Sequence, residues 1–275
     1  MTKQAINPLA RRKFIKQLGL GVAGVSLLSL VSCGDSVVTD TTDNTSGSGD
    51  DSSSGSGSGG NSGDSGTSTS WATGGTASMT ANFPDDSIFA LTTACTVSLT
   101  KALTEGPCFF AADVLDDISE EQGGLPMQLC LQVIDAQCQP VSGLEVEVWH
   151  CDVAGLYSGD TSGSADSRRF NSGFCTGNDQ QALQAKWFRG YQVTDSSGRV
   201  NFKSCFPGWY SGRTIHIHFR VRNNNNDEVI SQFCFSDSLT EEICTGHPEY
   251  LARGIQNTTL SGGRDTVFGS NYQDF

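Results

Sequence analysis

The stretch GRTIHIHFRV, from Gly212 to Val221, decides the fold of this chain. In a β-strand, successive side chains point to opposite faces of the sheet. His216, His218 and Arg220 therefore share one face. The other face carries only apolar side chains, those of Ile215, Ile217, Phe219 and Val221. This alternation predicts a half-buried strand whose polar face places two imidazoles where both can bind one metal ion. A pair of surface or hydrogen-bonded histidines is the alternative, because a His-x-His pattern is short.

Similar alternating runs, separated by turn residues, lie on both sides of this stretch. They are MQLCLQVID (Met127–Asp135), LEVEVWH (Leu144–His150), YQVTDSSGRVNFKS (Tyr191–Ser204, two strands around a turn) and EVISQFCF (Glu228–Phe235). The last run is expected to pair with the histidine strand across the intervening asparagine-rich loop. Many short strands with polar turns predict an all-β domain, an antiparallel β-sandwich. Helix is expected to be minor, at Asp116–Gln122, at Asp179–Lys186 and after Ser238.

The N-terminal residues have the pattern of an export signal. RRKFIK (Arg11–Lys16) precedes an apolar stretch, Leu18–Val31, which is too short for a comfortable membrane span. The stretch ends in LVSC, which resembles a bacterial lipobox with Cys33 as the lipidated residue. Residues 1–32 are therefore predicted to be a twin-arginine lipoprotein signal peptide, with an uncleaved membrane anchor as the alternative. Either interpretation places the remaining residues outside the cytoplasm, in the periplasm or on the cell surface.

Residues 33–79 are predicted to be a disordered tether, because Gly, Ser, Thr and Asp cannot build a core. The folded domain is then expected at residues 80–275. The whole chain has a formal net charge of −13, and removal of the basic signal would make it more acidic still. Such a chain repels nucleic acid and anionic lipid. We therefore expect no nucleic-acid partner and contact with a membrane only through a lipid on Cys33. The oligomeric state stays open.

Ten cysteines are present. With Cys33 set aside, nine are left, and in an exported chain these predict disulfides with one cysteine left over. Their pairing does not follow from the sequence. No C-x-x-C pair is present, so a zinc ribbon is not expected.

Four motifs in order resemble those of the intradiol ring-cleavage dioxygenases, most of all their short, exported members. They are TEGPCFF (Thr104–Phe110), WHCDVAGLYS (Trp149–Ser158), RGYQVTDSSGRVNF (Arg189–Phe202) and PGWYSGRTIHIHF (Pro207–Phe219). The resemblance spans roughly residues 103–235. Two departures stand out. Cys108 occupies a position where the family commonly has an aromatic hydroxyl, and the long N-terminal helical dimerisation region of the catechol 1,2-type enzymes is missing.

The resemblance implies a mononuclear non-haem Fe(III) centre with Tyr157, Tyr210, His216 and His218 as metal ligands. Arg213 would face the bound substrate and stabilise negative charge on it. The chemistry agrees with this ligand set, since a hard trivalent ion favours anionic oxygen donors and a phenol gives up its proton on binding one.

The reaction implied is cleavage of a catechol-type aromatic by O2 to a muconate-type diacid. Tyr210 would leave the metal and act as a base for the catechol, so Arg213 and Tyr210 are the expected catalytic residues.

Two alternative functions remain. One is a non-catalytic tethered β-sandwich module that binds aromatics or glycans. The other is a zinc or copper site made from His216 and His218 alone, although zinc sites rarely contain two phenols.

Overall fold

The computed structural model describes residues 20–23, 71–89, 100–159, 170 and 173–272. The elements are β1 (Leu20–Ala23), η1 (Gly75–Ser78), η2 (Asp86–Phe89), β2 (Pro126–Asp135), β3 (Glu145–Trp149), α2 (Gln180–Gln184), β4 (Arg189–Val193), β5 (Arg199–Cys205), β6 (His216–Asn223), β7 (Asn226–Cys234) and α3 (Asp237–Gly246). Each sequence-predicted strand, with the histidine strand expected at Thr214–Val221, is present within one or two residues of its expected bounds. Among these described residues, no helix is long and apolar enough to cross a membrane.

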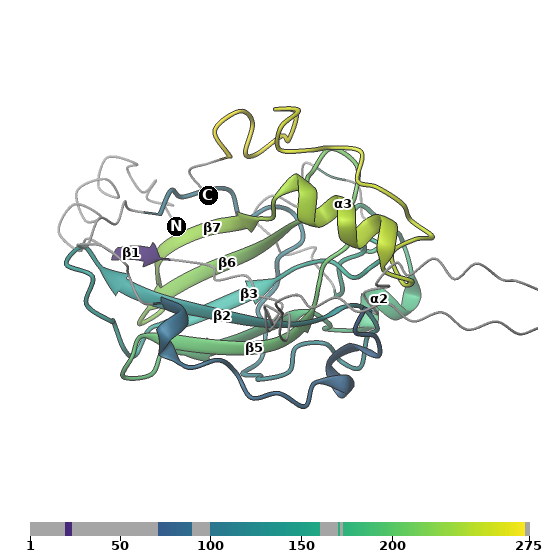
Figure 1. Cartoon of the computed structure of the whole chain (residues 1–275). Coiled ribbons are helices and arrows are strands. Elements are labelled where there is room, and N and C mark those ends of the chain that lie inside the picture. Colours follow the sequence, from purple (N-terminus) through teal and green to yellow (C-terminus); the bar gives the residue numbers. More distant parts are fainter. Residues whose placement is uncertain (1–19, 24–70, 90–99, 160–169, 171–172, 273–275) are drawn as a thin grey trace, which may run out of the picture. The chain divides into compact units, whose positions relative to one another are not determined.

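The strands form two antiparallel sheets, as Figure 1 shows. One sheet has the order β1-β2-β5, and the other has the order β4-β3-β6-β7. The predicted pairing of the histidine strand β6 with β7 is confirmed, with His216 opposite Cys234. The turn between β4 and β5 joins strands of different sheets. These features confirm the predicted all-β sandwich with little helix.

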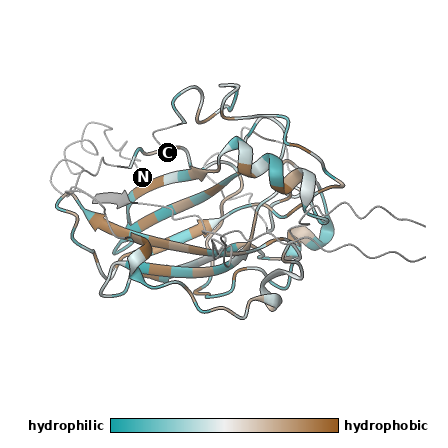
Figure 2. Ribbon diagram, in the orientation of Figure 1, coloured by the Kyte–Doolittle hydropathy of each residue, from teal (hydrophilic) through white to brown (hydrophobic). Residues whose placement is uncertain are grey.

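The core lies between the two sheets because each strand directs its apolar face inward. The apolar face predicted for β6 is buried, with Ile217 fully inaccessible to solvent. Facing side chains from the other sheet include Leu129 and Phe202. Figure 2 shows the resulting alternation of hydrophobic and hydrophilic residues along the strands. The polar face of β6 is therefore held at a fixed position on the outer side of its sheet.

A buried histidine connects the two layers. His150, directly after β3, has Nε2 2.7 Å from Ser204 Oγ in β5 and Nδ1 2.8 Å from the carbonyl oxygen of Cys151. Burial lowers the pKa of His150 to about 4. This side chain is therefore a neutral structural group.

The helix expected at Asp116–Gln122 is not formed. The segment consists of bends and a turn, with one isolated bridge from Asp117 to Lys203. Glu120 and Glu121 have φ values of 48° and 62°, which a right-handed helix does not accept. Its main chain instead pairs with the edge of the sandwich, where tertiary hydrogen bonds outweigh helix propensity.

The fold includes residues that the sequence analysis placed elsewhere. Trp71 packs against the main core and lies edge-on to His247, with ring centroids 5.9 Å apart. The packed part of the chain therefore begins before Thr80, and His247 is fully buried. Strand β1 lies within the expected signal peptide and pairs with β2. Residues 33–70, the larger part of the expected tether, lie outside the described residues.

The prediction that all but one of the nine cysteines form disulfides is wrong. Five of them are thiols, namely Cys130, Cys151, Cys205, Cys234 and Cys244. In the β2–β5 ladder, Cys205 lies opposite Pro126 and Cys130 lies opposite Asn201. Four residues along a strand span about 13 Å, and a disulfide requires Cα atoms less than about 7 Å apart. These two cysteines therefore cannot bridge.

We expect Ile217→Ala to lower the free energy of unfolding by about 2–5 kcal/mol, because it leaves a cavity between the sheets. Chemical denaturation measures this. Leu251→Ala is the control, since Leu251 is 53% exposed, and it should change stability by less than about 0.5 kcal/mol. Equal losses in the two variants would contradict the assignment of the core.

Stability should also fall in mild acid. The unfolded chain protonates His150 near pH 6.5, whereas the folded chain does so only near pH 4. Between these values the unfolded state binds more protons, so the free energy of unfolding decreases as pH falls from 6.5 towards 4. His150→Gln should reduce this pH slope by up to one proton in the metal-free protein. An unchanged slope would contradict a neutral, buried His150.

Candidate active site

The site is built where β6 begins, from side chains that arrive on separate loops. His216 and His218 project from the polar face of β6. Tyr210 lies in the loop before that strand, and Tyr157 follows β3. Tyr157 is fixed through its main chain, because its N–H donates to the carbonyl oxygen of Cys175 at 2.8 Å. All four predicted ligands are therefore brought to one place.

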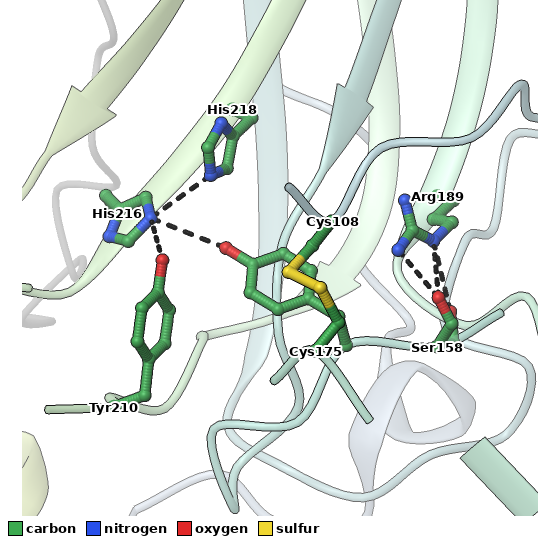
Figure 3. Close-up of a disulfide and its surroundings, with 8 residues drawn as sticks. Cys108, Ser158, Cys175, Arg189, Tyr210, His216 and His218 are labelled. Atoms are coloured by element: carbon green, nitrogen blue, oxygen red, sulfur yellow. Dashed lines mark hydrogen bonds between the residues drawn. A yellow bond between two sulfur atoms is a disulfide. The ribbon is translucent and has the colours of Figure 1, made fainter. Parts of the chain in front are cut away.

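Their donor atoms converge on a single point. His216 Nε2 lies 3.2 Å from His218 Nε2, 3.1 Å from Tyr210 Oη and 3.4 Å from Tyr157 Oη. Figure 3 shows His218 and Tyr210 directed at His216. Ligand atoms about 2 Å from one ion, at angles of roughly 90–110°, are about 3 Å apart. The four side chains thus have the spacing of a ligand set for a single metal ion.

The imidazoles are in the form that binds metals. His216 Nδ1 lies 2.6 Å from the carbonyl oxygen of Thr214, so the proton is on Nδ1 and the lone pair of Nε2 faces the site. Burial, and then the charge of Arg213, lowers the pKa of both His216 and His218 well below 6.5. Both side chains are neutral at physiological pH.

The phenols need a cation to ionise. Burial raises the pKa of Tyr157 well above 10 and that of Tyr210 to about 12. A highly charged metal ion reverses this effect, since it stabilises the phenolate directly. Two phenol oxygens and two neutral imidazoles form a donor set that suits a hard trivalent ion such as Fe(III).

The described part of the chain contains no metal-binding cluster made of three or more His, Cys, Asp or Glu side chains.

His218 is held on two sides. Its ring stacks on Trp149, with centroids 4.9 Å apart and planes 15° from parallel. Gly106, in the EGP segment, lies at the Cε1 edge of the ring and has a φ of +80°. A Cβ at Gly106 would lie 3.2 Å from Cε1 of the imidazole. The EGPCFF motif therefore needs glycine at this position to let the main chain approach a ligand ring.

A cavity of about 300 Å³ opens beside the four donor atoms. Tyr157, Tyr210, His218 and Arg213 form its polar end. The remaining wall is largely apolar and includes Pro107, Phe170, Phe174 and Val267. This volume and lining suit one substituted aromatic ring with its polar groups directed at the donor atoms.

The disulfide Cys108–Cys175 joins two walls of this cavity (Figure 3). Cys108 lines the cavity itself, in the position that the sequence analysis noted as a departure from the family. Cys175 follows Phe174 and accepts the hydrogen bond from the Tyr157 main chain. The bridge therefore connects the EGPCFF segment to the residue that fixes a ligand tyrosine.

Arg213 is also located at the site, with Nη1 3.3 Å from His216 Nε2. Two residues that hold it were missed by the sequence analysis, namely Gln232 and Asp265. Gln232 could have been found from the predicted pairing of the histidine strand with Glu228–Phe235. It lies opposite His218 in the β6–β7 ladder and therefore on the polar face. Asp265 carried none, because it belongs to an irregular segment without periodicity.

The comparisons with known proteins agree with this geometry. A family model described as dioxygenase matches residues 105–246. An intradiol ring-cleavage dioxygenase from Tetranychus urticae is 29% identical in sequence, with a TM-score of 0.50, and the match covers 62% of this chain and 80% of that one. A second solved dioxygenase is also 29% identical, with a TM-score of 0.51, over 64% of this chain and 83% of that one.

The fold, the ligand set and these matches define a class of protein, and this chain belongs to the family of intradiol ring-cleavage dioxygenases. Among the curated proteins it is similar to a chlorocatechol 1,2-dioxygenase of Pseudomonas putida, with 23% identity over 146 residues. That match covers 44% of this chain and 49% of the relative, so the chain spans about half the length of the curated protein it matches.

Removing the disulfide with Cys108→Ser/Cys175→Ser should lower the free energy of unfolding by about 2–4 kcal/mol, because the bridge closes a loop between residues 67 apart in sequence. Denaturant unfolding of the metal-free protein measures this loss. Cys234→Ser, which changes a half-buried thiol, is the control. A loss no larger than that of the control would contradict a bridge between the cavity walls.

Proposed function

We propose that this protein is an Fe(III)-dependent dioxygenase that cleaves a catechol-type aromatic between its two hydroxyl-bearing carbons. One O2 is consumed, both of its atoms enter the product, and the product is a muconate-type diacid. The convergence of Tyr157, Tyr210, His216 and His218 on one point, in a member of this family, carries the proposal.

The four ligand residues would hold the ion, and Arg213 would lie beside it. Fe(III) bound there would supply a Lewis acid that holds both catechol oxygens and makes the ring reactive towards O2. The two neutral imidazoles would remain in place, because His216 Nδ1 is bonded to Thr214 and the His218 ring packs against Trp149. The cavity would hold the ring, since its wall places aromatic and aliphatic side chains opposite the donor atoms.

The two tyrosines differ in a way that assigns their roles. Tyr157 is 2% exposed and its main chain is tied to Cys175. Tyr210 is only partly buried and lies on the loop that lines the cavity. Tyr210 is therefore the phenol that can move away and accept a proton from the catechol, so it would serve as the base. Arg213 Nη1 would stabilise negative charge that develops on the substrate.

The proposal extends to the location of the protein. The paired arginines and the LVSC sequence support a twin-arginine lipoprotein signal, with a lipid on Cys33 as the membrane attachment. The acidic net charge of −13 supports the absence of a nucleic-acid partner. The non-catalytic binding module is not favoured, because such a module has no need for two phenols and two imidazoles around one point.

The decisive experiment measures iron content and visible absorption of the purified protein, before and after anaerobic addition of catechol. We expect about one iron per chain and a tyrosinate charge-transfer band that shifts when catechol binds. Admission of O2 should then give a ring-cleaved diacid, identified by mass spectrometry. A protein that stays colourless after reconstitution with iron would overturn the proposal.

A matched pair of variants tests the ligand assignment. His218→Gln should lose at least tenfold in iron affinity, because it removes a ligand. His247→Gln also replaces a buried histidine, but His247 Nε2 bonds to the carbonyl oxygen of Ala72, and its iron affinity should be unchanged. Iron titration of both variants measures this, and equal iron binding would rule out His218 as a ligand.

A further inference from the structure

The C-terminal residues after α3 contribute a buried carboxylate beside the site. They lie beyond residue 246, where the family match ends, and Figure 1 shows them in yellow, crossing above β7 and α3. Asp265 in this segment is 3% exposed. Its carboxylate accepts N–H donors from Thr214, Val267 and Phe268, at 2.7–2.9 Å, and from Arg213.

The contact with Arg213 determines where the guanidinium points. Arg213 Nε donates to Asp265 at 3.0 Å from Oδ2 and 3.2 Å from Oδ1. Nη2 donates to Gln232 Oε1 at 2.5 Å. The third nitrogen, Nη1, lies 3.3 Å from His216 Nε2 and faces the donor atoms. Two of the three nitrogens are thus held from behind, and the planar group has one orientation left.

Asp265 also compensates a charge that the site does not easily accommodate. Arg213 is 7% exposed, and a buried guanidinium without a counter-ion is strongly destabilising. The same region would have to accept a trivalent ion. Among the described residues, Asp265 is the carboxylate within ion-pair distance of Arg213. Asp265 also accepts a hydrogen bond from the main-chain N–H of Thr214. The carbonyl oxygen of Thr214 in turn bonds to His216 Nδ1, so Asp265 contacts the main chain that orients a proposed ligand.

We propose that Asp265 is a positioning residue that acts through Arg213. It fixes the guanidinium with Nη1 directed at the substrate and neutralises its charge, so the C-terminal segment is part of the catalytic apparatus. The inference rests on the proposed function, because positioning matters only if Arg213 acts on a bound catechol.

A structural role must be separated from a positioning role, since Asp265 also fastens the segment. Asp237 provides the matched control. Its two carboxylate oxygens accept N–H donors from Leu260 and Ser261, each at 2.8 Å. Asp237 therefore fastens the same segment to the start of α3, and among the described contacts it makes none with Arg213.

The test compares Asp265→Asn, Asp237→Asn, Arg213→Gln and the double variant Asp265→Asn/Arg213→Gln. Iron content, kcat and KM are measured for catechol, and Kd for 4-nitrocatechol is measured as a binding probe. Asp265→Asn should keep its iron and lose about 10–100-fold in kcat/KM, mainly through kcat, because a displaced catalytic group costs rate. Asp237→Asn should change kcat/KM by less than about threefold.

The double variant gives the sharpest result. If Asp265 acts through Arg213, adding Asp265→Asn to Arg213→Gln should cause less than about threefold further loss. Full additivity, or an Asp265→Asn loss no larger than that of Asp237→Asn, would overturn the inference while the wild type stays active. A wild type that neither cleaves catechol nor binds 4-nitrocatechol would overturn the proposed function, and this inference with it.

Should Asp265→Asn not fold, Asp265→Glu and Asp237→Glu replace the pair. The longer side chain keeps the charge and displaces the guanidinium, so Asp265→Glu should still lower kcat at least fivefold, whereas Asp237→Glu should not. Equal kcat in the two variants would count against the positioning role.

Discussion

The site depends on the close approach of three donor atoms, from His218, Tyr210 and Tyr157, to a fourth, His216 Nε2, at 3.1–3.4 Å. Burial favours the neutral forms of these phenols and imidazoles, because it raises the pKa of Tyr157 and lowers the pKa of His216. Such a cluster is stable only where the surrounding structure fixes it or a cation binds its donor atoms together. The sandwich meets this requirement by burying the apolar face of β6 in its core, which leaves the opposite face rigid.

The positions of the ligands follow from packing more than from local sequence. Trp149 stacks on the His218 ring and Gly106 lies at its Cε1 edge. The Cys108–Cys175 bridge joins the glycine-containing segment to the carbonyl that fixes Tyr157. The EGPCFF departure at Cys108 is thereby explained. Cys108 forms a covalent connection between cavity walls.

The sequence predicted the parts of the molecule that have a period or a motif. Alternation located β6 and its two faces, and the four motifs located the residues that the structure brings together around His216. The sequence-based predictions failed where contacts between residues distant in sequence determine the local structure. Glu120 and Glu121 adopt positive φ because their segment pairs with the sandwich edge. Buried thiols were read as disulfides because spacing along the chain carries no information about ladder position.

Asp265 illustrates the same limit at the site itself. The family match ends before residue 247 and contains every ligand residue together with Arg213. The groups that orient the guanidinium come from two sources, Gln232 inside the match and Asp265 beyond it. In the proposed mechanism, the four ligand residues would determine which ion is bound, whereas the orientation of Arg213 would determine how charge on the substrate is stabilised. On this proposal, a change at Asp265 would alter kcat while the four proposed ligand residues stay in place.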